Sequence, residues 1–149
     1  MARALDITLR GGSGRVETPV ALLRSDVVAY ALELRSLHER GEYWLALEKA
    51  LQTRDHPTLG QVSESYLRVN ERMLMQLCEW KVGALERAPS LAMTPDQLMR
   101  LKLDHRAGFL MSLVDGKTSF EEIVQISQLV RLHALFILGR LLELGAIRR

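Results

Sequence analysis

The clearest pattern of hydrophobic and polar positions lies in the C-terminal third, over residues 109–147. A short apolar run ends at Asp115-Gly116, and a second apolar run follows Ser119. A third, longer run ends at Gly145, before two apolar residues that continue the chain. Apolar positions at helical spacing, bounded by turn formers, indicate short amphipathic helices. The pattern therefore predicts three helices followed by a short extended segment.

Signals at the helix ends support this division. Thr94 with Gln97, and Ser119 with Glu122, each have the spacing of a capping box, in which two side chains satisfy the first backbone N–H groups of a helix. Asp104 is a third candidate cap. We therefore expect helices to begin just after positions 94, 104 and 119.

The front of the chain also has helical periodicity. A first helix is expected to start at Thr18-Pro19 or at Ser25-Asp26 and to end at Gly41, and a second follows at once over residues 42–53. The short break makes the two an antiparallel helical hairpin. Residues 1–18 contain a glycine cluster between alternating apolar positions, which is compatible with a flexible arm or a short hairpin.

A third element in this region carries a near-heptad apolar stripe. The stripe predicts one long helix reaching toward residues 86–87, with these positions on one face: Leu59, Val62, Tyr66, Val69, Met73, Leu77 and Trp80. The stripe either packs on the helical hairpin or pairs two copies of the chain as a homodimer. Ala88-Pro89-Ser90 ends the helix and marks the expected domain boundary.

The predicted fold class is therefore all-α. Residues 1–18 form an arm or hairpin, residues 19–88 form the helical hairpin and long helix, and residues 94–149 form a winged-helix-like trihelical module. Leucine and alanine are abundant, and aromatic residues make up 5% of the chain, which favours helices over strands.

Composition narrows the function classes. A net charge of +2 over 149 residues does not predict a nucleic-acid partner, because DNA-binding domains usually carry a clear basic face.

The single cysteine, Cys78, forms no intrachain disulfide, and no run is long and apolar enough to span a membrane, so we expect a cytoplasmic protein. The four histidines are isolated, with no metal-ligand spacing and no nucleophile–base pair. We therefore predict no catalytic, metal-binding or cofactor-binding residues and no enzymatic activity.

The last predicted helix supplies most of the candidate binding residues. Its expected outward positions hold Arg131, His133 and Phe136, with Arg140 further along. A phenylalanine where a DNA-reading helix would place a polar side chain favours a protein contact. Trp44, in the second helix, is the fifth candidate for partner binding, because arginine and aromatic side chains dominate binding energy at protein interfaces.

Six motifs in the last third carry a resemblance to a known module: Asp104-His105-Arg106, Gly108-Phe109-Leu110, Ser112-Leu113-Val114-Asp115-Gly116, Ser119-Phe120-Glu121-Glu122-Ile123, Arg131-Leu132 and Leu141-Leu142-Glu143-Leu144-Gly145. They resemble the degenerate winged-helix module of signalling and regulatory proteins from myxobacteria-like bacteria. The resemblance implies a module without activity of its own that mediates protein contacts. Residues 41–51 also resemble the middle of a tetratricopeptide repeat, although no second copy follows.

These observations lead to one favoured hypothesis and two alternatives. The favoured one is a non-enzymatic regulatory or adaptor protein that binds a signalling or regulatory protein. The first alternative is a winged-helix DNA-binding regulator, dimeric through the Leu59–Trp80 stripe. The second is a structural subunit of a larger assembly, in which the helical front makes oligomer contacts.

Overall fold

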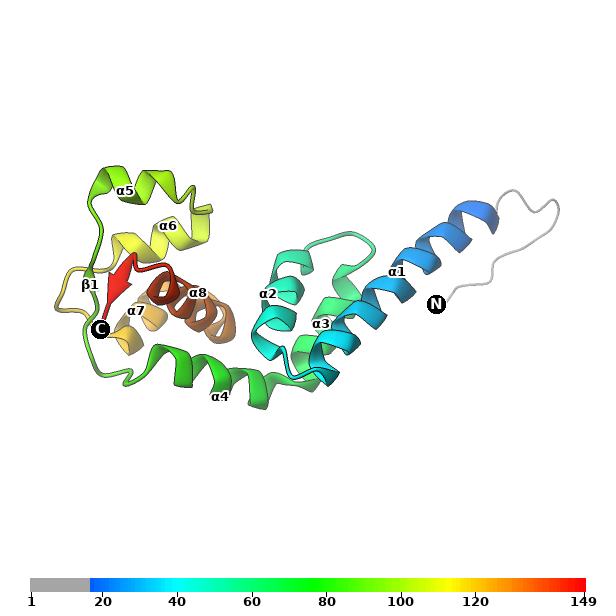
Figure 1. Ribbon diagram of the computed structural model, residues 1–149, viewed down its shortest axis with the longest axis horizontal. Helices are drawn as coiled ribbons and strands as arrows, with labels where there is room; N and C mark the ends of the chain where they lie inside the picture. The colour runs from blue at the N-terminus through cyan, green and yellow to red at the C-terminus, as the bar shows by residue number, and fades with distance from the viewer. Residues whose placement is uncertain (1–16) are drawn as a thin grey trace. The chain divides into compact units, whose positions relative to one another are not determined.

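The structure, a computed structural model, describes residues 17–149, with side chains from residue 25 onward. Its described part contains eight helices and one two-stranded sheet, which confirms the all-α prediction (Figure 1). The predicted arm or hairpin over residues 1–18 lies outside this range, except for its last two residues, which belong to the first helix. The chain divides into two compact units, residues 1–70 (unit 1) and 71–149 (unit 2).

Unit 1 contains three helices: α1 (Glu17–Glu39), α2 (Tyr43–Thr53) and α3 (Gly60–Val69). The predicted helical hairpin corresponds to α1 and α2, which pack on each other and on α3. Gly41 forms the turn between them with φ +77°, a conformation that glycine adopts without the steric cost other residues bear. Because α1 starts at Glu17, the alternative start at Ser25-Asp26 lies inside the helix.

The core of unit 1 lies where the three helices meet. Tyr30, Leu34, Leu37 and Ala46 are buried there, and Leu59, Val62 and Tyr66 pack against them. One buried polar contact interrupts this apolar core: the Tyr30 hydroxyl lies 2.7 Å from Ser63 Oγ and 3.3 Å from the Lys49 carbonyl oxygen. These hydrogen bonds satisfy polar groups that would otherwise be buried without partners.

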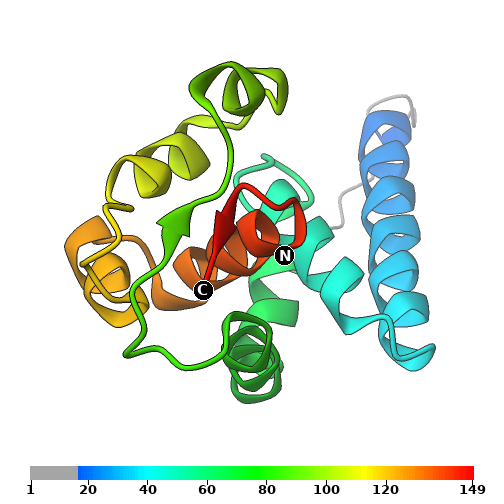
Figure 2. The ribbon, with the colours of Figure 1, turned by 60° about the vertical axis from the view of Figure 1, so that its left-hand side comes forward.

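Unit 2 is built around one central helix. Its elements are α4 (Glu71–Val82), β1 (Ser90–Leu91), α5 (Pro95–Arg100), α6 (His105–Ser112), α7 (Phe120–Ser127), α8 (Arg131–Glu143) and β2 (Ile147–Arg148). Helix α8 contacts α4, α6, α7 and β2, and eight of its 13 residues are buried. Figure 2 shows β2 beside β1, with which it pairs antiparallel so that Leu91 lies opposite Ile147.

The three predicted helix caps are confirmed. In each capping box the N-cap oxygen accepts a hydrogen bond from the backbone N–H three residues on, at 3.2 Å for Thr94 and 3.1 Å for Ser119, and the reciprocal bond also forms. Asp104 Oδ1 accepts from the Ala107 N–H at 2.9 Å. The three helices predicted within residues 109–147 correspond to α6, α7 and α8, and the extended segment after Gly145 leads into β2.

The prediction of one long helix from residue 59 to residues 86–87 is wrong. The chain breaks at Asn70, which leaves helical geometry at φ −106° and ψ +15°. The predicted stripe divides accordingly, since Leu59, Val62 and Tyr66 pack in unit 1, whereas α4 buries Leu74, Cys78 and Val82. Val69 and Trp80, both expected on one interface, are 75% and 76% exposed. The stripe is therefore divided between two helices, and the homodimer through Leu59–Trp80 stays a prediction.

The predicted domain boundary at residues 88–94 also differs from the structure, which places the division between Asn70 and Glu71. Helix α4 belongs to unit 2 because its buried face packs on α8. The loop after α4 belongs there too: the carbonyl oxygens of Leu85 and Arg87 accept hydrogen bonds from the first N–H groups of α7, at 3.0 and 2.9 Å. These non-local contacts hold residues 83–89 inside unit 2.

Candidate protein-binding groove

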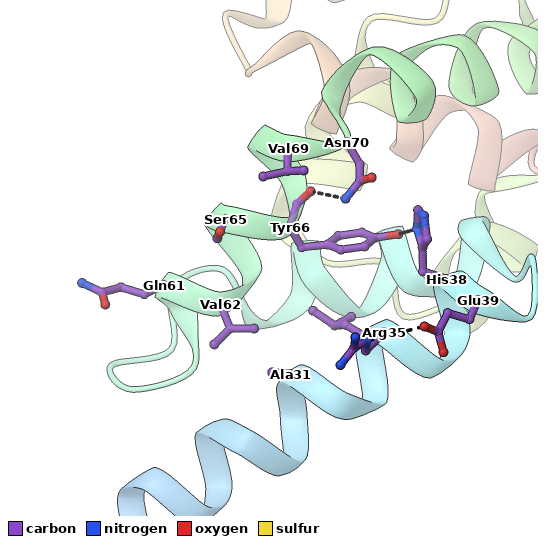
Figure 3. A pocket seen from close by; sticks show the side chains of 11 residues that line it. Ala31, Arg35, His38, Glu39, Gln61, Val62, Ser65, Tyr66, Val69 and Asn70 are labelled. Carbon is purple, nitrogen blue, oxygen red and sulfur yellow. Dashed lines mark hydrogen bonds and ion pairs between the residues drawn. The ribbon is translucent and has the colours of Figure 1, made fainter.

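An open groove of about 690 Å³ lies between α1 and α3, entirely within unit 1 (Figure 3). We refer to it as the α1–α3 groove. Its apolar lining comes from Ala31 and Leu34 on α1 and from Val62 and Val69 on α3. Leu34 and Val62 also belong to the core, whereas Val69 projects into solvent. The groove is thus a place where the apolar interior of unit 1 extends to the surface.

Polar and charged side chains form the rim of the groove. On α1, Arg35 and Glu39 form an ion pair with Nε and Oε2 3.5 Å apart, and both side chains are about two-thirds exposed. On α3, Gln61 and Ser65 line the opposite edge (Figure 3). An exposed ion pair of this kind contributes at most about 1 kcal/mol to stability. Both partners are therefore able to exchange this contact for another at little cost.

Aromatic residues and an amide form the end of the groove near the α1–α2 turn. His38 Nδ1 and the Tyr66 hydroxyl share a hydrogen bond of 3.0 Å, and the His38 ring meets the edges of Tyr43 and Tyr66 at centroid distances of 4.9 and 5.6 Å. Asn70 Nδ2 donates to the Tyr66 carbonyl oxygen at 2.9 Å. Burial, with a smaller effect from Tyr43, raises the Tyr66 pKa to about 12, so the phenol stays protonated near neutral pH.

Two aliphatic side chains extend the apolar surface along α1, outside the groove itself. Val28 and Leu32 are 56% and 54% exposed. They precede Arg35 and Glu39 with spacings of four, three and four residues, which places all four on one side of the helix. Exposure of the Val28 and Leu32 side chains to water costs free energy, roughly 25 cal/mol per Å² of apolar surface. The edge of the groove is therefore amphipathic along α1.

The structure places the five sequence-predicted binding residues outside this groove. Trp44 lies on α2 and is partly buried, and the other four lie on α8. The exposed position predicted for Phe136 is wrong, because its side chain is only 8% exposed. The apolar residues lie nearly all round this helix, and their spacing alone does not decide which of them faces solvent.

The polar candidates on α8 engage neighbouring residues. Arg131 makes a bidentate ion pair with Glu121, with N–O distances of 2.7 and 2.8 Å. This hydrogen bonding lowers the pKa of Glu121 and raises that of Arg131. Arg140 is exposed and lies 3.5 Å from Glu143, and His133 is partly buried. Arg131, His133 and Arg140 thus lie on one helix, where Arg131 and Arg140 form ion pairs with neighbouring glutamates.

Sequence reasoning did not identify the α1–α3 groove. The available signal was the width of the apolar pattern on α1, because Val28 and Leu32 fall outside the stripe that Tyr30, Leu34 and Leu37 bury. A helix with apolar residues on more than one side covers more than one surface. The second surface could be recognised only once the positions of α2 and α3 were known.

The terminal arginines serve the unit's own backbone. Arg149 donates from Nε to the Val82 carbonyl at 2.9 Å and from Nη2 to the Lys81 carbonyl at 2.6 Å, thereby capping the C-terminus of α4. Arg148 Nε donates to Ser90 Oγ at 3.2 Å. These contacts tie the end of the chain to both α4 and β1.

The single cysteine of the chain, Cys78, lies on α4. Cys78 is fully buried, and burial, with a smaller effect from Glu79, raises its thiol pKa to about 12. Among residues 17–149 no group of three or more histidine, cysteine or acidic side chains is placed to hold a metal ion. Within the same part of the chain, no helix has the length and apolar character needed to cross a bilayer.

No protein-family model, curated protein or solved structure matches this chain.

Proposed function

We propose that the chain is a non-enzymatic regulatory or adaptor protein and that the α1–α3 groove is its docking site for a protein partner. The observation that carries the proposal is the open apolar groove with exposed aliphatic residues beside it. Ala31, Leu34, Val62 and Val69 supply the apolar lining, and Val28 and Leu32 continue it along α1. Interfaces between proteins combine such an apolar centre with a polar rim.

The form of the groove favours a helical ligand. Two neighbouring helices leave a channel between them that can accept the ridge of a third helix. Amphipathic helices bind in such channels through apolar residues spaced three or four apart. The rim residues Arg35, Glu39, Gln61 and Ser65 would then face the polar sides of the bound helix. Binding of this kind requires no catalytic group.

Trp44 on α2 and, separately, the α8 residues Arg131, His133, Phe136 and Arg140 stay predictions of partner binding, with Phe136 the weakest because it is buried. DNA binding through α8 is less well supported than protein binding. A recognition helix must present a free face to the bases, and α8 buries eight of its 13 residues. The bidentate pair between Arg131 and Glu121 also neutralises a cation that would otherwise meet phosphate.

The experiment compares affinity capture by the tagged full chain with capture by two variants. Ser65→Arg places a long charged side chain at the exposed edge of the groove, and Gln52→Arg makes the same addition at an exposed position on α2 outside it. We expect proteins retained by the wild type and by Gln52→Arg to be lost with Ser65→Arg. Equal retention by all three would contradict the groove assignment. A gel shift on mixed-sequence DNA at low salt, if positive and salt-dependent, would favour the DNA-binding alternative.

A further inference from the structure

Helix α1 is much longer than the helices beside it. It contains 23 residues, whereas α2 contains 11 and α3 contains 10. At 1.5 Å per residue α1 is about 34 Å long and its neighbours about 16 Å. Figure 1 shows the N-terminal part of α1 continuing past α2 and α3. Among the residues of α1 whose side chains are described, from position 25 onward, only Tyr30, Leu34 and Leu37 are buried.

Helical stability comes mainly from tertiary packing, so a long helix with few buried residues has surface left for a further partner. Helix α1 carries Val28 and Leu32 on its solvent side. The same side of α1 forms one edge of the α1–α3 groove. An apolar ridge and an apolar groove thus adjoin each other on one surface.

We infer that the helix occupying the α1–α3 groove is α1 of a second copy of this chain. In a two-fold dimer the same surface is used by both copies, so it must contain each feature together with its complement. An antiparallel pair of α1 helices meets this requirement. Val28 and Leu32 of each copy would fill the apolar groove of the other, near Ala31 and Val62. This inference rests on the proposed function, in which the groove binds a protein helix.

Charge is compatible with self-association of this unit. Residues 1–70 contain nine lysine and arginine residues and nine aspartate and glutamate residues, so the difference is zero. Two copies of unit 1 therefore meet without net repulsion. At the groove edge, Arg35 and Glu39 present one charge of each sign. A second copy offers the same two charges, whereas a strongly acidic or basic partner would leave one of them facing a like charge.

The test measures the mass of the full chain in solution by size exclusion with light scattering, over a wide range of protein concentrations. The monomer mass is 16.9 kDa, and we expect the wild type to reach twice that value as concentration rises. Leu32→Glu and Val28→Glu should shift the protein to the monomer mass, because each buries a charge in the interface. Leu45→Glu is the matched control: it changes an exposed leucine of α2, 45% exposed, and should leave the dimer intact.

Circular dichroism of each variant shows whether the fold is kept. We expect it to be kept, because the substituted residues are exposed in the monomer. A wild type that stays at the monomer mass at every concentration would overturn the inference. So would a dimer that all three variants leave unchanged. If the wild type stays monomeric but Ser65→Arg still loses the captured proteins, the groove binds a helix of another protein. The proposed function then stands and the inference does not. Failure of both experiments would remove the groove as a docking site.

Discussion

The longest helix of unit 1 and the longest helix of unit 2 are used in opposite ways. Helix α8 lies at the centre of its unit, with neighbours on several sides and most of its residues buried. Helix α1 lies at the edge of its unit, and between residues 25 and 39 it buries only Tyr30, Leu34 and Leu37. An enclosed helix has little surface left for a partner. Helix α1 therefore has more surface available to a partner than α8, although most of the binding residues predicted from the sequence lie on α8.

The two units also differ in how their interiors are stabilised. The described core of unit 1 depends on a buried hydroxyl pair, Tyr30 with Ser63, besides its apolar contacts. Helix α8 buries only apolar residues and one glycine, and the buried Ser127 hydroxyl of unit 2 donates locally to the Val124 carbonyl oxygen at 2.8 Å. An apolar centre loses stability mainly through cavities, whereas a polar pair loses it through unsatisfied groups. The same kind of truncation should therefore have different consequences in the two units.

The largest effect is expected for Leu138→Ala at the centre of unit 2. Leu138 is fully buried on α8, so its truncation removes apolar contacts and leaves a cavity. Such changes cost about 2–5 kcal/mol in the free energy of unfolding. Urea unfolding followed by tryptophan fluorescence measures this loss of stability. The measurement uses a Trp44→Phe background, in which Trp80 is the remaining tryptophan and reports on unit 2.

Met99→Ala is the control for this substitution, because Met99 is 77% exposed on α5. Substitutions at exposed positions usually change stability by less than about 0.5 kcal/mol. If Leu138→Ala unfolds at the same urea concentration as Met99→Ala, then α8 does not form the centre of unit 2 and the comparison fails.

A smaller effect is expected for the polar pair of unit 1. Ser63→Ala leaves the Tyr30 hydroxyl with only its longer contact to Lys49, and Tyr30→Phe leaves Ser63 unpaired. A buried polar group left without its partner costs about 1–3 kcal/mol. Urea unfolding in a Trp80→Phe background, in which Trp44 reports on unit 1, measures each cost.

The double variant tests whether the two side chains act together. Because Tyr30→Phe with Ser63→Ala removes both polar groups, its cost should be less than the sum of the two single costs. Strict additivity would mean that the pair does not interact in solution. The stability of unit 2, read from Trp80, serves as the internal reference for all three variants.

The smallest effect is expected for the ion pair between Arg131 and Glu121. Hydrogen bonding from Arg131 lowers the folded-state pKa of Glu121, so the pair stabilises the fold above the ordinary glutamate pKa. That contribution is lost as pH falls through the lowered folded-state pKa. Both side chains are about one-third exposed, so the contribution at neutral pH should be at most about 1 kcal/mol.

A comparison of the free energies of unfolding of Glu121→Gln and the wild type across the acid range measures the contribution of the ion pair. The stability difference should be present at neutral pH. It should disappear in acid, where the protonated Glu121 of the wild type and the glutamine of the variant are both uncharged. Glu122→Gln is unsuitable as a control because Glu122 belongs to the cap of α7, whereas Glu86→Gln changes an exposed glutamate of the loop after α4. A difference that persists unchanged in acid would show that Glu121 acts through packing rather than charge.

The sequence by itself determined where most helices begin and end. The capping boxes at Thr94 and Ser119, the cap at Asp104 and the turn at Gly41 all act within a few residues of their own position. Local hydrogen bonding and backbone sterics decide such features, so a local pattern is sufficient to predict them. The all-α class followed from these signals together with the helical spacing of the apolar residues.

Only the tertiary structure decided which helices belong together and which faces stay open. The helix is interrupted at Asn70, and Leu67 is buried in unit 1 whereas Leu74 is buried in unit 2, although the apolar spacing continues through both. Phe136 is buried, while Val28 and Leu32 on α1 face solvent. Apolar side chains look the same in the sequence whether they form a core or a docking surface. Their role depends on neighbours distant in the chain, which helical periodicity does not record.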